Sequence, residues 1–138
     1  MNPVVHFEMP YEDRDRAAKF YESAFGWKFQ MMGPEMGNYA VAITSETADP
    51  SGKPDTPGSI NGGFYKKSAD PSSHCPSFVI AVKDIREAMK KVEAAGGTVV
   101  GSKDKPGEPD MIPGIGLWIS AKDSEGNRIS ILEPSGQM

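Results

Sequence analysis

Two polar residues near the start of the chain have the types and spacing of an acid–base pair. His6 and Glu8 lie two residues apart in the segment VVHFEM, and alternate residues of a strand project on the same side. A neighbouring carboxylate raises the pKa of an imidazole, so the pair could move a proton or hold a polar ligand. The alternatives are structural: a hydrogen-bonded histidine, and a carboxylate that serves a backbone group or an arginine.

The segment that carries these residues is predicted to be a strand, because it is rich in β-branched and aromatic residues. Its odd positions Val5, Phe7 and Met9 are all apolar, whereas its even positions are mixed. The odd positions are therefore expected to face the core, and His6 and Glu8 to face the other side.

A helix is predicted to follow, near residues 14–25. Asp13 can cap it and Gly26 can end it. Between them the apolar residues recur at helical spacing: Ala17, Phe20, Tyr21, Ala24 and Phe25. The next strands are expected at Trp27–Met31, Tyr39–Thr44 and Ile60–Tyr65.

The same pattern then repeats along the chain. A shift of 71 residues aligns Phe7 with Phe78, Asp13 with Asp84 and Gly26 with Gly97. The first strand, the helix cap, the helix and the glycine that ends it therefore fall at matching positions in the two copies. The second copy is predicted to have a helix near 85–95 and strands at Phe78–Val82, Thr98–Gly101, Leu117–Ala121 and Arg128–Leu132. Loops rich in Pro, Gly, Ser and Asp are expected at Ser45–Ser59, Lys66–Pro76 and Gly101–Gly114.

These elements predict an α+β fold of two tandem βαβββ modules, near residues 3–66 and 76–134 of a single domain. A helix covers one face of its small sheet, so the opposite faces are left to line a cup of mixed β-sheet. A concave surface of this kind with a few polar groups is typical of a small-molecule pocket.

The alternation of side chains also divides the strand residues of the second module into a core side and a cup side. Phe78, Ile80, Ile129 and Ile131 are predicted to be core residues. Ser77, Arg128 and Ser130 are predicted to lie on the cup side with His6 and Glu8, and Trp118 to form an apolar wall. Arg128 could pair with Glu8 or receive an anionic group of a ligand.

At these residues the chain resembles the vicinal oxygen chelate superfamily of glyoxalase-like, bleomycin-resistance-like and extradiol-dioxygenase-like proteins. The similar segments are HFEMPYEDRDRAAKFYESAFGWKF, FVIAVKDIREAMKKVEAAGGTVV and KDSEGNRISILEP. The resemblance implies paired βαβββ modules, often in a homodimer. It also implies a divalent metal in the enzymes, held by two ligands from each module, one on its first strand and one on its last.

The family's ligand positions match this chain at one residue. His6 stands at the position of the family's first-strand histidine, and the equivalent position in the second module is Ser77. The last-strand glutamate of the second module is replaced by Ser130, and the last-strand position of the first module falls near Asn61–Gly63. Neutral hydroxyls hold Zn²⁺ or Ni²⁺ poorly. We therefore expect no metal cofactor; the alternative is a divalent metal at His6, completed by Glu8 and by His74 after a register shift.

The predicted function is metal-independent binding of a small organic molecule, with His6, Glu8, Ser77, Trp118, Arg128 and Ser130 as contacts and His6 and Glu8 as the catalytic candidates. The alternative is a metal-dependent lyase, isomerase or dioxygenase related to lactoylglutathione lyase. A module that pairs its sheet edges with a partner is a third option.

Composition excludes other classes of partner. The net charge of −4 and the absence of a basic stripe argue against nucleic acid, and no apolar run approaches the length of a membrane span. A single cysteine, Cys75, and the lack of a signal-peptide pattern predict a cytoplasmic protein. Uncovered sheet edges favour a homodimer.

Overall fold

In the computed structural model, which describes residues 1–46, 54, 56–102 and 104–136, the chain divides into two compact units. One comprises His6–Pro76, and the other comprises Met1–Val5 with Ser77–Met138. Most of the loop predicted at 45–59 lies outside the described residues.

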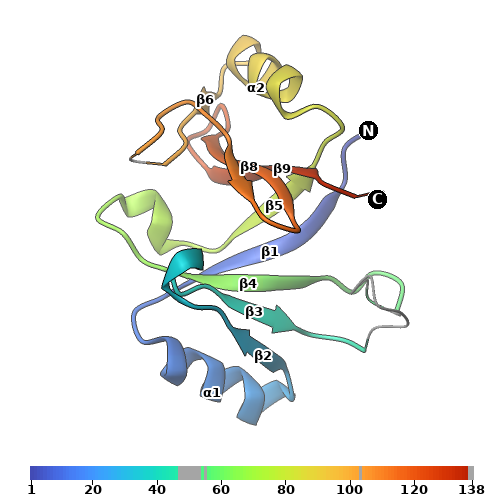
Figure 1. Ribbon diagram of the computed structural model, residues 1–138, viewed down its shortest axis with the longest axis vertical. Helices are drawn as coiled ribbons and strands as arrows, with labels where there is room; N and C mark the ends of the chain where they lie inside the picture. Colours follow the sequence, from blue (N-terminus) through green and yellow to red (C-terminus); the bar gives the residue numbers. More distant parts are fainter. Residues whose placement is uncertain (47–53, 55, 103, 137–138) are drawn as a thin grey trace. The chain divides into compact units, whose positions relative to one another are not determined.

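The described residues of the His6–Pro76 unit form one α-helix and four strands, which are labelled in Figure 1. Its elements are β1 (Val4–Tyr11, whose first two residues count with the other unit), α1 (Arg14–Phe25), β2 (Lys28–Met31), β3 (Ala40–Ile43) and β4 (Asn61–Lys66), with 3-10 helices η1 (Pro34–Met36) and η2 (Pro71–His74). The strand order is β2-β3-β4-β1. Only β1 and β4 are parallel; the other neighbours are antiparallel.

The second unit has the same topology with one addition. Its elements are β5 (Ser77–Ala81), α2 (Ile85–Ala94), β6 (Thr98–Val99), β7 (Asp110–Ile112), β8 (Gly116–Lys122) and β9 (Arg128–Pro134). The order is β5-β9-β8-β6, with β5 and β9 parallel, and β7 pairs with β8. The α+β fold with its repeated βαβββ order is therefore confirmed.

Two short elements correct the predicted loops. Strand β7 lies within the segment Gly101–Gly114, whose Pro and Gly content hides a strand of three residues. Within Lys66–Pro76, Asp70 accepts a hydrogen bond from the Ser72 N–H at 2.9 Å and caps η2.

Both helices begin at the predicted caps. The Asp13 carboxylate accepts from the Arg16 N–H at 3.0 Å, and the Asp84 carboxylate accepts from the N–H groups of Arg86 and Glu87. Such bonds satisfy donors that have no partner inside the helix. Gly26 ends α1 with a φ of 74°, in the left-handed region that glycine adopts without strain.

A second carboxylate serves the start of α2. The Oε1 atom of Glu133, at the end of β9, accepts from the Ile85 N–H at 3.0 Å. Glu133 therefore has a structural role at the start of the helix and is not only a surface charge at the end of a strand. A negative charge at a helix N-terminus is also favoured by the helix dipole.

Each helix packs on one face of its own unit's sheet. Under α1 the buried cluster contains Tyr11, Ala40, Ala42 and Phe64, and Phe7 and Met9 pack against it. Under α2 the buried cluster contains Val82, Ile85, Ile119, Ala121 and Ile131, and Ile80 and Ile129 pack against it. The predicted inward positions are thus confirmed, except at two residues.

Phe78 is 39% exposed, so its assignment to the core is wrong. It shares the phase of Ile80, but the cluster under α2 does not reach the first residues of β5. The alternation of side chains along a strand determines on which side of the sheet a residue lies. It does not determine whether the helix covers that residue. Val5 is partly buried and belongs to neither cluster.

Phe64 tests the core of the His6–Pro76 unit. It is 2% exposed and makes ring contacts with Phe7, Tyr21 and Phe29. Phe64→Ala is expected to lower the free energy of unfolding by about 3–5 kcal/mol. Phe20→Ala is the control, because Phe20 is 58% exposed, and it should cost much less. Equal losses in urea denaturation would contradict this core.

Candidate functional site

His6 and Glu8 lie on the face of the β1–β4 sheet that α1 does not cover. In the parallel ladder His6 pairs with Asn61 and Glu8 with Gly63, and paired residues share a face. Phe7 and Met9 point to the helix side. Glu8 is 7% exposed, whereas His6 is exposed. The predicted pair therefore shares one surface, which we call the open face of the His6–Pro76 unit.

Tyr39 adds a phenol to this open face. It immediately precedes β3, and its ring lies across Gly63 of β4: a Cβ atom on Gly63 would collide with Oη, Cζ and Cε2 of Tyr39. The neighbouring glycine is constrained in the same way on the other face of the sheet, because a Cβ on Gly62 would collide with the carbonyl oxygen and ring of Phe7. The NGG segment is thus a strand in which close packing on both faces excludes side chains.

The surroundings of Tyr39 disfavour a negative charge. The pKa of the Tyr39 phenol is raised far above its usual value, mainly by burial and to a smaller extent by the Glu8 carboxylate and by Tyr65. Desolvation and like charge both disfavour the phenolate. Tyr39 is therefore a neutral hydroxyl, and it lies close enough to Glu8 to feel its charge.

The polar groups of His6 and Asn61 have structural partners. The His6 Nδ1 atom is 3.0 Å from the Asn61 carbonyl oxygen. The Asn61 Oδ1 atom accepts from the Thr44 N–H at 2.9 Å. Asn61 therefore holds the ends of β3 and β4 together, and its amide oxygen is already used, which weakens the one ligand that the INGG segment could offer a metal.

Four predicted residues lie on the equivalent face of the second unit. In β8 and β9, Trp118 pairs with Leu132 and Ser120 pairs with Ser130, whereas Leu117, Ile119 and Ile131 pack on the helix side. Ser130 is fully buried, and Arg128 and Trp118 are partly buried. Ser77 is partly buried, and its Oγ atom is enclosed without a hydrogen-bond partner among the residues that the structure describes. That Arg128 pairs with Glu8 stays a prediction.

His74 is tied to its own loop. Its Nε2 atom is 2.8 Å from the Ser68 carbonyl oxygen, within the segment that contains η2. Within residues 1–46, 54, 56–102 and 104–136, no three His, Cys, Asp or Glu side chains come together as metal ligands. This arrangement does not support a site built from His6, Glu8 and His74.

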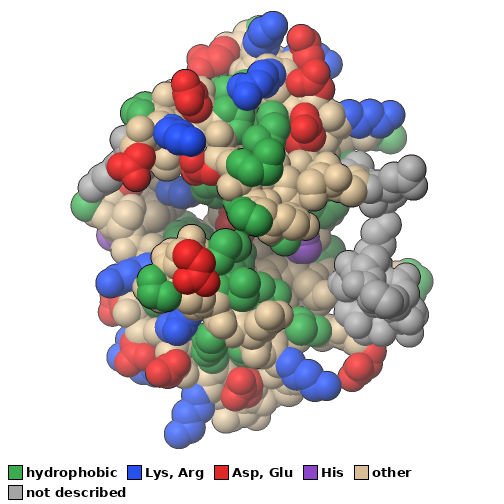
Figure 2. Space-filling model, in the orientation of Figure 1, with side chains coloured by type: hydrophobic (Ala, Val, Ile, Leu, Met, Phe, Trp, Pro, Cys, Tyr) green, Lys and Arg blue, Asp and Glu red, His purple; other side chains and the backbone are tan. Residues whose placement is uncertain are grey.

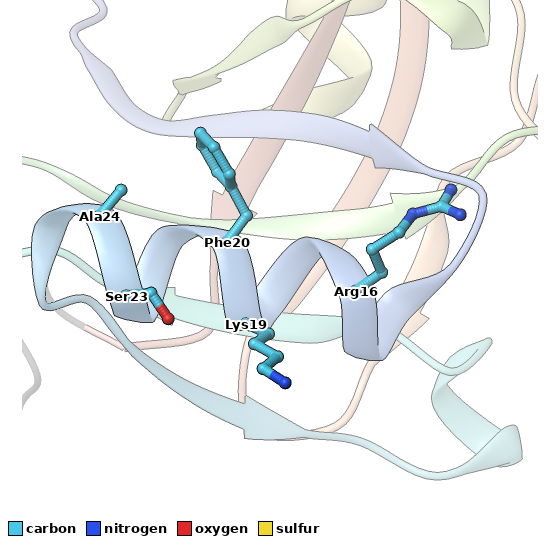
Figure 3. A pocket seen from close by; sticks show the side chains of 5 residues that line it. All are labelled: Arg16, Lys19, Phe20, Ser23 and Ala24. Carbon is cyan, nitrogen blue, oxygen red and sulfur yellow. The ribbon is translucent and has the colours of Figure 1, made fainter.

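A hollow of about 430 Å³ lies elsewhere, on the outer side of α1 (Figure 3). It is lined by Arg16, Lys19, Phe20, Ser23 and Ala24. It is shallow and mostly apolar, and α1 lies on the opposite side of its sheet from Glu8. We therefore do not place the site there, although it is the more obvious depression.

The face drawn in Figure 2 carries charges of both signs. Figure 2 shows Lys and Arg side chains intermingled with Asp and Glu over the face in view. No helix among the described residues is long and apolar enough to cross a membrane.

Comparison with known proteins decides the family. Residues 4–45, which include Glu8 and Tyr39, match the family model of the bleomycin resistance protein-like N-terminal domain. A glyoxylase-like domain-containing protein of Didymella fabae is 30% identical over 135 residues, covering 97% of this chain and 95% of that protein. The chain belongs to the glyoxalase-like (vicinal oxygen chelate) superfamily.

Solved structures of this glyoxalase-like fold agree at low sequence identity. Methylmalonyl-CoA epimerase from Mycobacterium tuberculosis superposes with a TM-score of 0.64 at 14% identity, over 96% of this chain and 88% of that one. A glyoxalase/bleomycin resistance protein/dioxygenase superfamily member from Vibrio splendidus 12B01 gives 0.56 at 12% identity, over 96% and 99%. These similarities establish the fold of the chain.

Tyr39 was not singled out from the sequence of this glyoxalase-like protein. The signal that could have found it is the pair Gly62–Gly63 inside a predicted strand, since glycine within a strand often marks a close approach by another group. Alternation with the buried Ala40 and Ala42 then places Tyr39 on the open face.

The raised pKa of Tyr39 makes the stability of the protein depend on alkaline pH. Its folded-state pKa lies above the ordinary value of 10.0, so the unfolded chain loses this proton first as the pH rises. The resulting stability is complete below about pH 10 and is lost above it. The Tm of the wild type is therefore expected to fall more steeply above about pH 10 than that of Tyr39→Phe. Parallel Tm curves for the two proteins would refute the assignment.

Proposed function

We propose that this glyoxalase-like protein binds a small organic molecule on the open face of its His6–Pro76 unit, and that it does so without a catalytic metal. One observation carries the proposal: a carboxylate that is 7% exposed, Glu8, and a neutral phenol, Tyr39, lie together on the sheet face opposite α1, which no helix among the unit's described residues covers. Polar groups of this kind in an otherwise apolar surface orient a ligand.

The apolar surroundings of this pair come from the neighbouring strand. Val41 pairs with Gly63 in the β3–β4 ladder, so its side chain shares the open face, and Ile43 follows two residues later. Tyr65, two residues after Gly63, adds an aromatic ring whose hydroxyl donates to the Cys75 carbonyl oxygen at 3.2 Å. A ligand with an aromatic or aliphatic body would bury these side chains while its polar group meets Glu8 and Tyr39.

Family membership supports a ligand-binding role, and the segment that matches the bleomycin resistance protein-like model is the one that contains both groups. The second unit presents Ser77, Trp118, Arg128 and Ser130 on its equivalent face. Their contact with the ligand, and the roles of His6 and Glu8 in any reaction, remain parts of the proposal.

The donor set does not fit the divalent metal of the family's enzymes. His6 is the imidazole at the expected position; its Nδ1 faces a carbonyl oxygen, so Nε2 is the one nitrogen that it could offer a metal. Ser77 and Ser130 offer neutral hydroxyls, and the Asn61 amide oxygen bonds the Thr44 N–H. One nitrogen ligand with neutral oxygens makes a poor Zn²⁺ or Ni²⁺ site. The alternative function is a metal-dependent lyase, isomerase or dioxygenase, for which His6 would be the first ligand.

Cytoplasmic location and a homodimer complete the proposal. Cys75 is exposed and free, which suits a reducing compartment. The strands that end the sheet order, β2 and β6, leave edges that a second copy could cover. Light scattering at micromolar concentration should give the mass of a dimer, and a monomer mass would count against it.

Native mass spectrometry of protein purified without chelator from its own host tests the main proposal. We expect an organic molecule to co-purify with the wild type and to be reduced in Glu8→Gln, with no stoichiometric metal in either protein. His74→Ala is the matched control and should behave as the wild type, because His74 contacts its own loop. Stoichiometric Zn²⁺ or Ni²⁺ that disappears in His6→Ala would establish the alternative function instead.

A further inference from the structure

The turn between β2 and β3 is tied to the helix side of the sheet. One guanidinium nitrogen of Arg14, Nη1, donates to the Met32 carbonyl oxygen at 2.8 Å and to the Asn38 carbonyl oxygen at 3.1 Å. The Tyr11 hydroxyl donates to the same Asn38 oxygen at 2.7 Å. Arg14 begins α1, and Tyr11 lies in the cluster under that helix. Both ends of the turn are therefore held from the side of the sheet opposite the proposed site.

The backbone of this turn is held in a conformation that costs free energy. Asn38 has a φ of 56°, and among the residues that the structure describes it is the only non-glycine residue with a positive φ. A side chain disfavours this left-handed region, although asparagine tolerates it better than most residues. Such a conformation persists where the surrounding contacts determine it. The two hydrogen bonds to the Asn38 carbonyl oxygen are contacts of this kind.

The restrained carbonyl group belongs to the peptide bond that joins Asn38 to Tyr39. Because a peptide group is planar, holding its oxygen toward the helix side also orients the backbone of Tyr39. The Tyr39 carbonyl oxygen in turn accepts from the Met32 N–H at 2.8 Å. With its backbone fixed at both ends, Tyr39 places its ring over Gly63 on the open face. The position of the phenol thus depends on two donors that lie across the sheet from it.

We infer, resting on the proposed function, that Arg14 and Tyr11 are positioning residues for the ligand site. They act through the Asn38 carbonyl oxygen, which determines where the Tyr39 phenol lies on the open face. Tyr11 is 6% exposed and Arg14 is part of α1, so both lie on the helix side of the sheet. A change in either residue is therefore expected to alter ligand binding on the opposite face.

Tyrosine labelled with ¹³C at Cζ reports on the phenol, because this carbon shifts when the hydroxyl ionises. The Tyr39 signal is identified by its absence from Tyr39→Phe. Its pKa is raised above 10.0, chiefly by burial, so in the wild type the signal should stay constant up to about pH 11. In Arg14→Gln, which removes the donor to both carbonyl oxygens, the phenol becomes less buried and its pKa should fall toward 10.0.

Tyr11→Phe is the second variant, and it carries the same test if Arg14→Gln does not fold. It removes one hydroxyl and keeps the ring in the cluster under α1. The pKa of Tyr39 should therefore shift in the same direction as in Arg14→Gln, but by less. The dispersion of the amide spectrum reports whether each variant is folded.

Binding is measured with benzyl alcohol, which has an apolar ring and one polar group. The amide shifts of β1, β3 and β4 are followed in ¹⁵N-labelled protein. Arg14→Gln is expected to weaken binding about fivefold, roughly the effect of losing one hydrogen bond. Added to Tyr39→Phe, it should have little further effect, because it acts through Tyr39.

Arg16→Gln is the matched control. Arg16 also lies on α1, but its side chain is 70% exposed and forms an ion pair with Glu12. Both the ionisation of Tyr39 and the binding of benzyl alcohol should therefore match the wild type. An effect as large as that of Arg14→Gln would mean that the loss of any arginine from α1 disturbs the site, and it would overturn the inference.

The remaining outcomes distinguish the inference from the proposed function. If Tyr39 ionises at the same pH in Arg14→Gln as in the wild type, or if this variant binds as tightly, the inference fails while shifted open-face amides still support the binding site. A loss from Arg14→Gln that is equally large in the Tyr39→Phe background would also overturn it. If benzyl alcohol at about 10 mM shifts none of these amides in the wild type, the open face is not the site and both proposals fail.

Discussion

One helix can cover only one face of a four-stranded sheet, and the rest of the structure depends on this constraint. In each unit the helix packs on one face through residues of a single phase, and those residues form the core. The other phase is left for polar groups that a core would not accept. Glu8 is tolerated in β1 for this reason, because its neighbours Phe7 and Met9 satisfy the helix side.

The two units keep the same topology but have diverged on their open faces. The β1–β4 and β5–β9 ladders place Glu8 beside Gly63 and Val79 beside Ser130, and the shift of 71 residues makes Val79 the counterpart of Glu8. The first unit thus has a carboxylate and a phenol where the second has an aliphatic side chain and a buried hydroxyl. This divergence centres the proposed site on the His6–Pro76 unit.

Most of the fold could be predicted from the sequence, because its signals are local. Asp13 and Asp84 mark helix starts by chemistry that needs only the following residues, and alternation separates Phe7 and Met9 from His6 and Glu8. Properties that depend on distant segments could not be predicted in this way. The exposure of Phe78 depends on how far the cluster under α2 extends, and the role of Glu133 depends on a contact 48 residues away.

The proposed site was predicted less completely than the fold. That His6 and Glu8 share a face could be predicted because both lie on one strand, where spacing alone determines the side. Tyr39 was missed because its relation to Glu8 runs through Gly63, a residue of a third segment that has no side chain. When a phenol packs over a glycine, the glycine itself is the only sign of that contact in the sequence.

The measurement that tests the central claim most directly is a crystal structure of the protein with the molecule that co-purifies from its host. The account predicts that the molecule lies against the open face of the His6–Pro76 unit, with a polar atom within hydrogen-bond distance of the Tyr39 hydroxyl. A molecule bound on the outer side of α1 near Phe20, or in the loop that contains η2, would contradict it.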